Sequence, residues 1–167
     1  VYARAAEVEL LLNGKSVGKQ SMKNNCLFTF HVPYENGTLE AVAYDASGKE
    51  MGRCALKTAE AETVLQAVPE QTQVKPGRLC FIRLQYADAQ GIVKPAERGI
   101  LDVSVTGGKL VGLGSACPYY ELDYTGSQAD TYYGEALAIV EAGSEGTVTL
   151  TATDGKLTAS TSISIVN

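Results

Sequence analysis

The feature that most constrains the fold is a hairpin signal near the N-terminus, within Val8–Gly18 (VELLLNGKSVG). An Asn13-Gly14 pair separates two short runs of strand-forming residues. Asn-Gly is favoured in two-residue turns because both residues tolerate the positive φ that a type I′ turn requires. Two further turn signals of this kind, Asn36-Gly37 and Asp154-Gly155, are flanked by apolar-polar alternation. Nothing comparable marks a helix, so the pattern predicts an all-β chain.

The first half predicts a small sandwich that ends near residue 60. In the segment 26–32, Phe28, Phe30 and Val32 alternate with residues such as Thr29 and His31, which indicates one buried face. Lys57–Glu62 has charged and small residues without a period of two, as in a linker. The predicted strands are 7–13, 16–22, 26–32, 38–45 and 50–57.

The second half predicts seven strands, a number typical of an immunoglobulin-like sandwich. They lie near 63–68, 78–87, 100–106, 109–113, 135–141, 146–153 and 157–166. The fold class we predict is two tandem immunoglobulin-like β-sandwich domains, over 1–60 and 61–167. A module of about 60 residues buries little surface, and Val1 is not an initiator Met. We therefore expect the first sandwich to be truncated, with a strand supplied upstream in the natural chain, or to lean on the second.

Composition argues against several classes of partner and cofactor. The 14 Lys and Arg residues face 19 Asp and Glu, for a net charge of −5, and no basic stripe suits nucleic acid. No apolar run approaches the roughly 20 residues that cross a membrane. The cysteines have no CxxC spacing, so no metal or other cofactor is expected. We expect free thiols, although pairs within each half stay open; the four are Cys26, Cys54, Cys80 and Cys117.

The candidate catalytic motifs do not assemble into a site. Gly14–Gly18 matches the G-x-S-x-G nucleophile pattern, which requires a strand turning into a helix, whereas here it lies in a hairpin. The one histidine, His31, follows Ser16 with no acidic residue between them, so the Ser-acid-His order is not available. Four acidic residues lack a calcium-loop rhythm and suit a solvated loop; they are Glu121, Asp123, Asp130 and Glu135.

One local feature is unusual: five of the nine tyrosines lie within fifteen residues. They are Tyr119, Tyr120, Tyr124, Tyr132 and Tyr133. A tyrosine combines a flat apolar face with a hydroxyl, which suits stacking on a sugar or packing at a protein interface. The same rings could instead pack as a satellite core under a long loop. The sequence leaves these three interpretations open.

Two segments of the first half, Val8–Gly18 and then Val32–Asp45, resemble the small domain that follows the catalytic barrel in bacterial family 2 glycoside hydrolases of the β-galactosidase type. The second half looks like the immunoglobulin-like C-terminal domain of these enzymes, through Gly108–Gly114 (GKLVGLG) and Tyr133–Val140 (YGEALAIV). After Gly114, the family commonly continues with an Asn-Gly-Asp or similar loop, whereas this chain has Ser115–Pro118.

The resemblance implies a parent enzyme that releases terminal sugars from β-galactosides or related glycosides. In that family two catalytic glutamates stand in an upstream (β/α)8 barrel. No segment here matches either motif, so we assign no catalytic residue and expect the chain itself not to be an enzyme. The implied partner is the upstream catalytic domain of the same chain, together with a glycan or a second subunit. Such enzymes are often exported, which suggests a periplasmic or secreted parent.

Three hypotheses about function follow. The first is a non-catalytic accessory region of such a hydrolase, serving domain packing, assembly or substrate placement. The second is a carbohydrate-binding module that uses the tyrosines of 119–133. The third is an immunoglobulin-like adhesin or spacer.

Overall fold

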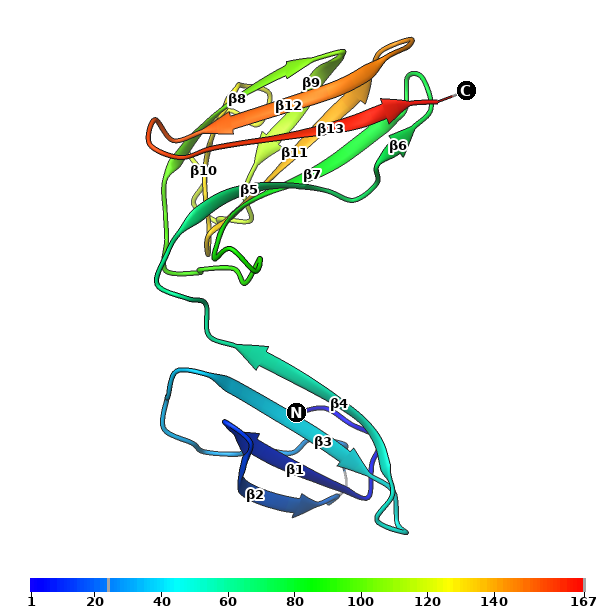
Figure 1. The fold of residues 1–167 in the computed structure, drawn as a ribbon, viewed down its shortest axis with the longest axis vertical. Helices are drawn as coiled ribbons and strands as arrows, with labels where there is room; N and C mark the ends of the chain where they lie inside the picture. Colours follow the sequence, from blue (N-terminus) through cyan, green and yellow to red (C-terminus); the bar gives the residue numbers. More distant parts are fainter. Residues whose placement is uncertain (24, 167) are drawn as a thin grey trace. The chain divides into compact units, whose positions relative to one another are not determined.

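The computed structural model describes residues 1–23 and 25–166, and its regular elements are all strands (Figure 1). The all-β prediction is therefore confirmed. The chain divides into two compact units, Val1–Thr58 and Ala59–Asn167. Among the described residues, no helix has the length and apolar character needed to cross a membrane.

The Val1–Thr58 unit contains one antiparallel sheet of four strands in the order β2-β1-β3-β4 (Figure 1). The predicted turn between the first two strands is present, with φ of +52° at Asn13 and +77° at Gly14. These values match a type I′ turn, whose twist suits a two-residue hairpin. The strands are β1 (Glu7–Leu12), β2 (Lys15–Ser21), β3 (Thr38–Tyr44) and β4 (Glu50–Lys57).

The segment 26–32 is not a strand of this sheet, so that prediction is wrong. Its alternation of buried and exposed residues is nevertheless real: Phe28 is 1% exposed and packs on one face of the sheet. The backbone of the segment bonds to the N-terminus, where Phe28 N donates to Val1 O at 2.9 Å and Ala3 N donates to Cys26 O at 3.0 Å. The face is therefore covered by an extended segment in place of a second sheet.

Asn36-Gly37 is not a hairpin turn either, because the residues directly before it, 28–36, form no strand that pairs with β3. The Asn13 side chain contacts this point instead, accepting from Thr38 N at 2.9 Å and donating to Asn36 O at 3.1 Å. Gly37 has φ of +133°, and a Cβ there would lie 1.8 Å from Asn13 Oδ1. The glycine is therefore required by close packing as well as by its backbone conformation.

The Ala59–Asn167 unit is a sandwich of two sheets, with orders β10-β8-β12-β13-β6 and β5-β7-β11-β9. All seven strands predicted for this half are present, and two short strands, β6 and β10, were not predicted. The strands are β5 (Val64–Pro69), β6 (Gln73–Val74), β7 (Leu79–Ala87), β8 (Ile100–Thr106), β9 (Gly108–Gly114), β10 (Gln128–Asp130), β11 (Glu135–Ala142), β12 (Thr147–Thr153) and β13 (Thr158–Ile165).

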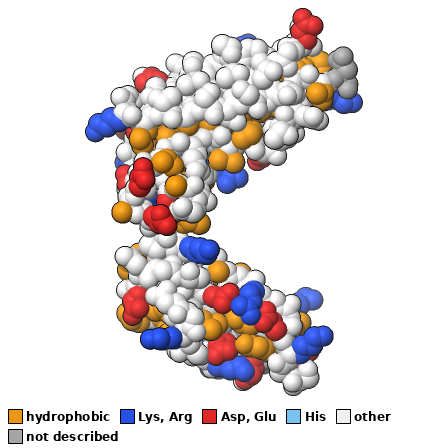
Figure 2. Space-filling view, viewed as in Figure 1, with side chains coloured by type: hydrophobic (Ala, Val, Ile, Leu, Met, Phe, Trp, Pro, Cys, Tyr) orange, Lys and Arg blue, Asp and Glu red, His pale blue; other side chains and the backbone are white. Residues whose placement is uncertain are grey.

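The hairpin of β12 and β13 shows how alternation builds this unit. Three of its inward residues, Val148, Leu150 and Ile163, are 0% exposed. Its outward residues are hydroxylic, and Thr149 Oγ1 lies 3.1 Å from Ser162 Oγ across the strands. Figure 2 shows a mostly uncharged surface over these two strands and mixed charges of both signs over the visible face of the Val1–Thr58 unit.

The connection between β12 and β13 corrects the turn prediction at Asp154-Gly155. Thr153 and Thr158 form the last strand pair, so the loop has four residues, 154–157, where a two-residue turn was expected. The Asp154 carboxylate accepts from Lys156 N at 2.8 Å and Leu157 N at 2.7 Å. This side-chain turn adds to the backbone bond in which Asp154 N donates to Leu157 O at 3.2 Å.

Two aspartates tie loops of the sandwich together. Tyr86, at 4% exposure, donates from its hydroxyl to Asp154 Oδ2 at 2.8 Å. Asp88, at 1% exposure, accepts from the backbone N–H groups of Glu60, Gln90 and Ile92 at 2.9–3.0 Å. These backbone bonds hold the pKa of each carboxyl below its ordinary value.

The four cysteines are free thiols in the structure. Cys80 is buried in the sandwich core, and burial raises its thiol pKa. Cys54 is exposed on β4.

Candidate functional site

The candidate site is a groove on the outer face of the sheet β5-β7-β11-β9. Along β11, Ala136, Ala138 and Val140 point into the core, so the residues between them face outward. The outward Leu137 and Ile139 pair with Gly114 and Gly112 of β9, and glycine adds no side chain to fill this surface. The result is an apolar groove of about 680 Å³.

Tyr124 forms a wall of the groove beside β9. Its backbone C=O accepts from Leu113 N at 2.8 Å, which fixes the loop to that strand. Its ring lies directly against Gly114, where a Cβ would be 2.4 Å from Tyr124 Cδ1. Tyr120 stacks behind it, with ring centroids 4.5 Å apart and planes at 30°. Burial in this stack raises the pKa of Tyr120.

Tyr132 and Tyr133 form another wall, through a tight turn before β11. Tyr132 N donates to Glu135 O at 2.9 Å, and Glu135 N donates to Tyr132 O at 3.1 Å. The two central residues, Tyr133 and Gly134, have φ of +50° and +80°, as in a type I′ turn. The two tyrosine rings meet edge to face at 4.5 Å, and the neighbouring Tyr133 raises the pKa of Tyr132.

Polar groups lie at the margins of this apolar surface. Arg83 of β7 places Nε 3.9 Å from Glu135 Oε1, and both side chains are about half exposed. At this distance the pair is an ion pair without a hydrogen bond. Ser115 Oγ, at the end of β9, is buried and has no hydrogen-bond partner among the described residues. Arg83 and Glu135 therefore leave hydrogen-bonding groups available at the margin of the groove.

The structure brings three of the five predicted tyrosines to the groove: Tyr124, Tyr132 and Tyr133. Tyr120 supports Tyr124 from behind, and Tyr119 is 86% exposed and does not line it. Arg83 and the apolar floor were not predicted from the sequence. The unbroken apolar run Ala136–Val140 was the available signal, because a strand with one wet face should alternate.

The remaining candidates do not converge on a reacting centre. Ser16 lies on β2 directly after the hairpin turn, and His31 is exposed in the covering segment. Asp123 accepts from Thr125 N at 2.8 Å within its own turn, and Asp130 pairs with Arg98. Over residues 1–23 and 25–166, no three His, Cys, Asp or Glu side chains are grouped to hold a metal ion.

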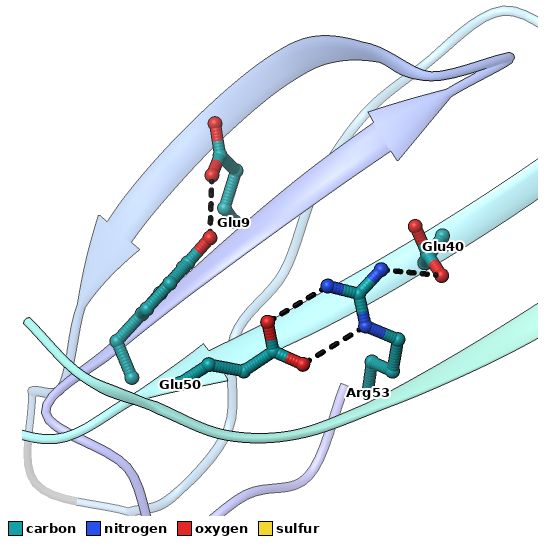
Figure 3. Close-up of polar contacts among 5 residues, drawn as sticks. Glu9, Glu40, Glu50 and Arg53 are labelled. Atoms are coloured by element: carbon teal, nitrogen blue, oxygen red, sulfur yellow. Dashed lines mark hydrogen bonds and ion pairs between the residues drawn. The ribbon is translucent and has the colours of Figure 1, made fainter.

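A second polar cluster lies on the Val1–Thr58 unit, on β3 and β4 (Figure 3). Arg53 donates two hydrogen bonds to the Glu50 carboxylate, from Nε at 2.9 Å and from Nη2 at 2.7 Å. It donates a third from Nη1 to Glu40 at 3.2 Å. These carboxylates raise the pKa of Arg53 further above its ordinary value. The Arg53 side chain is 52% exposed, so the cluster is a solvated surface network.

Comparison with known proteins gives the class to which this architecture belongs. Residues 64–163 match the family described as Glycoside hydrolase family 2 C-terminal domain 5, and residues 1–52 match a domain of unknown function, DUF4982. The first match covers more than half of the chain. The chain therefore belongs to the family 2 glycoside hydrolase C-terminal domains, as the resemblance implied.

Individual relatives agree with this assignment. The beta-galactosidase BoGH2A of Bacteroides ovatus is 29% identical over 157 residues, which cover 91% of this chain and 18% of that protein. A crystal structure of a glycosyl hydrolase family 2 member from Bacteroides cellulosilyticus is 30% identical, with a TM-score of 0.88, covering 98% of this chain and 23% of that one. A beta-glycosidase structure from Bacteroides vulgatus shares the fold, at 24% identity and a TM-score of 0.85, covering 96% of this chain and 21% of that one. The chain thus spans less than a quarter of each.

Proposed function

We propose that this chain acts as the C-terminal accessory region of a longer family 2 glycoside hydrolase of the β-galactosidase type. Its role is to pack against and position the catalytic domain, where hydrolysis takes place. The observation that carries this proposal is the order of the two matched domains, because a chain with both, in this order, aligns over 98% of its length with one family 2 hydrolase structure. A β-galactosidase among the relatives supports a galactoside as the substrate class.

The sheet of the Val1–Thr58 unit supports a packing role. Cys54 and Leu56 of β4 pair with Ala41 and Leu39 of β3, so their side chains share the face that packs on the small core. Yet Leu56 is 74% exposed, and Cys54 is also exposed. Apolar residues on the core side of a sheet favour burial. We propose that the catalytic domain of the longer chain covers this end of the face.

The test compares two proteins: this chain and the natural full-length product of its gene. Both are assayed on aryl β-galactoside and on related aryl glycosides. We expect hydrolysis from the full-length protein and none from the chain. Activity in the purified chain would contradict the accessory role, and a full-length product that has no catalytic barrel and no activity would favour a spacer.

A matched pair of variants of the full-length protein tests the packing face. Leu56→Asp places a charge on the proposed contact and should lower the temperature at which activity is lost. Met51→Asp, at another exposed position of β4 (59% exposed), is the control and should change it little. Equal effects of the two variants would contradict a specific contact at Leu56.

A further inference from the structure

We propose that the groove between Tyr124, Tyr133 and the floor residue Leu137 is a binding site for a neutral glycan built of pyranose rings. This inference rests on the proposed function. It adds a ligand for a domain to which only a packing and positioning role has been assigned. Every residue that lines the groove belongs to the Ala59–Asn167 unit. The unit therefore contains the whole site.

The first argument is the backbone of Tyr133. A type I′ turn favours Asn, Asp or Gly at its first central position, and a bulky residue with positive φ is uncommon. Strain of this kind is costly and concentrates at functional sites. Burial of the ring does not offset it, because Tyr133 is 64% exposed. The turn holds an aromatic face at the edge of the groove, where a ligand could use it.

The second argument is the chemistry of the lining. Tyr124 and Tyr133 offer flat faces on which the C–H face of a sugar ring can pack, and Leu137 and Ile139 offer an apolar floor. Arg83 supplies donors and Glu135 supplies acceptors. At 3.9 Å the two side chains do not hydrogen-bond to each other, so both remain available to a ligand. Opposite charges side by side leave no net charge for an ionic ligand. A neutral, hydroxyl-rich ring matches this set.

The third argument is size. Thirteen residues line the groove, whereas a stable protein interface uses about 20–30 residues on each side. Its volume of about 680 Å³ lies within the usual range for small-molecule sites. The dimensions therefore fit a short saccharide better than a second protein.

The experiment is a titration of the 167-residue chain with lactose and with β-1,4-galactobiose, followed by amide NMR shifts. We expect saturable shifts along β9, β11 and the turn at Tyr133. Tyr133→Asn removes the ring but keeps a residue that the turn favours, so the fold should persist while affinity falls about tenfold. Tyr119→Ala is the matched control, since this exposed tyrosine lies outside the groove, and its affinity should equal that of the wild type.

Three outcomes would overturn the inference. One is the absence of saturable shifts with both saccharides. Another is binding that Tyr133→Asn leaves unchanged. The third is a concentration-dependent dimer in sedimentation that Tyr133→Asn abolishes, which would assign the groove to contact between copies. Hydrolysis is measured on the longer protein and binding on this chain, so the two proposals can fail separately.

Discussion

The Val1–Thr58 unit and the Ala59–Asn167 unit differ in what covers their sheets. In the first, an extended segment lies on part of one face, and the connected core contains five buried residues. In the second, two sheets cover each other, and the described core contains nineteen. Small modules bury proportionately less surface and are marginal in stability. We therefore expect the first unit to unfold at lower denaturant concentration than the second.

The largest effect should come from Phe28→Ala. Phe28 is the largest side chain in the core of the first unit, and loss of a buried Phe costs about 3–5 kcal/mol. We expect the amide NMR signals of Val1–Thr58 to collapse while those of the sandwich stay dispersed. Leu27→Ala, at a neighbouring position that is 38% exposed, is the control. Simultaneous loss of both sets of signals would show that the units do not fold independently.

The next prediction compares the removal of one tyrosine hydroxyl from each unit. Tyr86→Phe removes a hydroxyl that donates to Asp154 in the buried sandwich and should cost about 1.5–3 kcal/mol, as for hydrogen bonds to charged groups. Tyr44→Phe removes a hydroxyl that donates to Glu9 at 3.0 Å at a half-buried position, and should cost less. Urea unfolding of each unit measures both, and a larger loss at Tyr44 would reverse the comparison.

Acid should lower the stability of the sandwich. Asp88 and Asp154 have lowered pKa values in the folded sandwich, chiefly through backbone N–H donors. Their contribution to stability is fully present above the ordinary pKa of Asp, about 3.9, and is lost as pH falls through the lowered folded pKa. Urea midpoints of the sandwich measured down the pH scale should fall in that window. The Asp88→Asn variant should show a shallower pH dependence, and an unchanged profile would remove Asp88 from this explanation.

The smallest effect should be Arg53→Lys on the first unit. Lysine keeps the charge but loses the forked contact with Glu50. Because the cluster is exposed, the loss should be slight and should disappear as salt is raised. Urea midpoints at low and high salt measure it. A loss that persists at high salt would indicate a structural role beyond charge.

The sequence predicted well where local chemistry decides the structure. Asn13-Gly14 forms the expected turn, and alternation in β12 and β13 places the correct side chains inside. It failed at 26–32, because the same alternation describes any extended segment with one covered face, and hydrogen-bond partners are non-local. It also missed β6 and β10, which have two and three residues and are too short to show a period.

The candidate site was predicted only in part, for a similar reason. Clustering of tyrosines is visible in the sequence, but which rings share a surface depends on strand pairing. The pairing of Leu137 with Gly114 brings the floor beside Tyr124, and the positive φ at Tyr133 sets the position of that ring. Neither follows from composition, and Arg83 lies 41 residues before Tyr124 in the chain.

The short strand β6 has a consequence for the behaviour of the protein in concentrated solution. The run Thr158–Ile165 (TASTSISI) is uncharged and strand-forming, the kind of segment that recruits other chains into stacked sheets. β6 pairs in parallel with Ser164 and Ile165, and β5 also packs beside β13. The two residues of β6 thus pair with backbone groups at the end of β13 that would otherwise be free to bond with another molecule. We therefore expect this minor element to reduce pairing between that end of β13 and other chains.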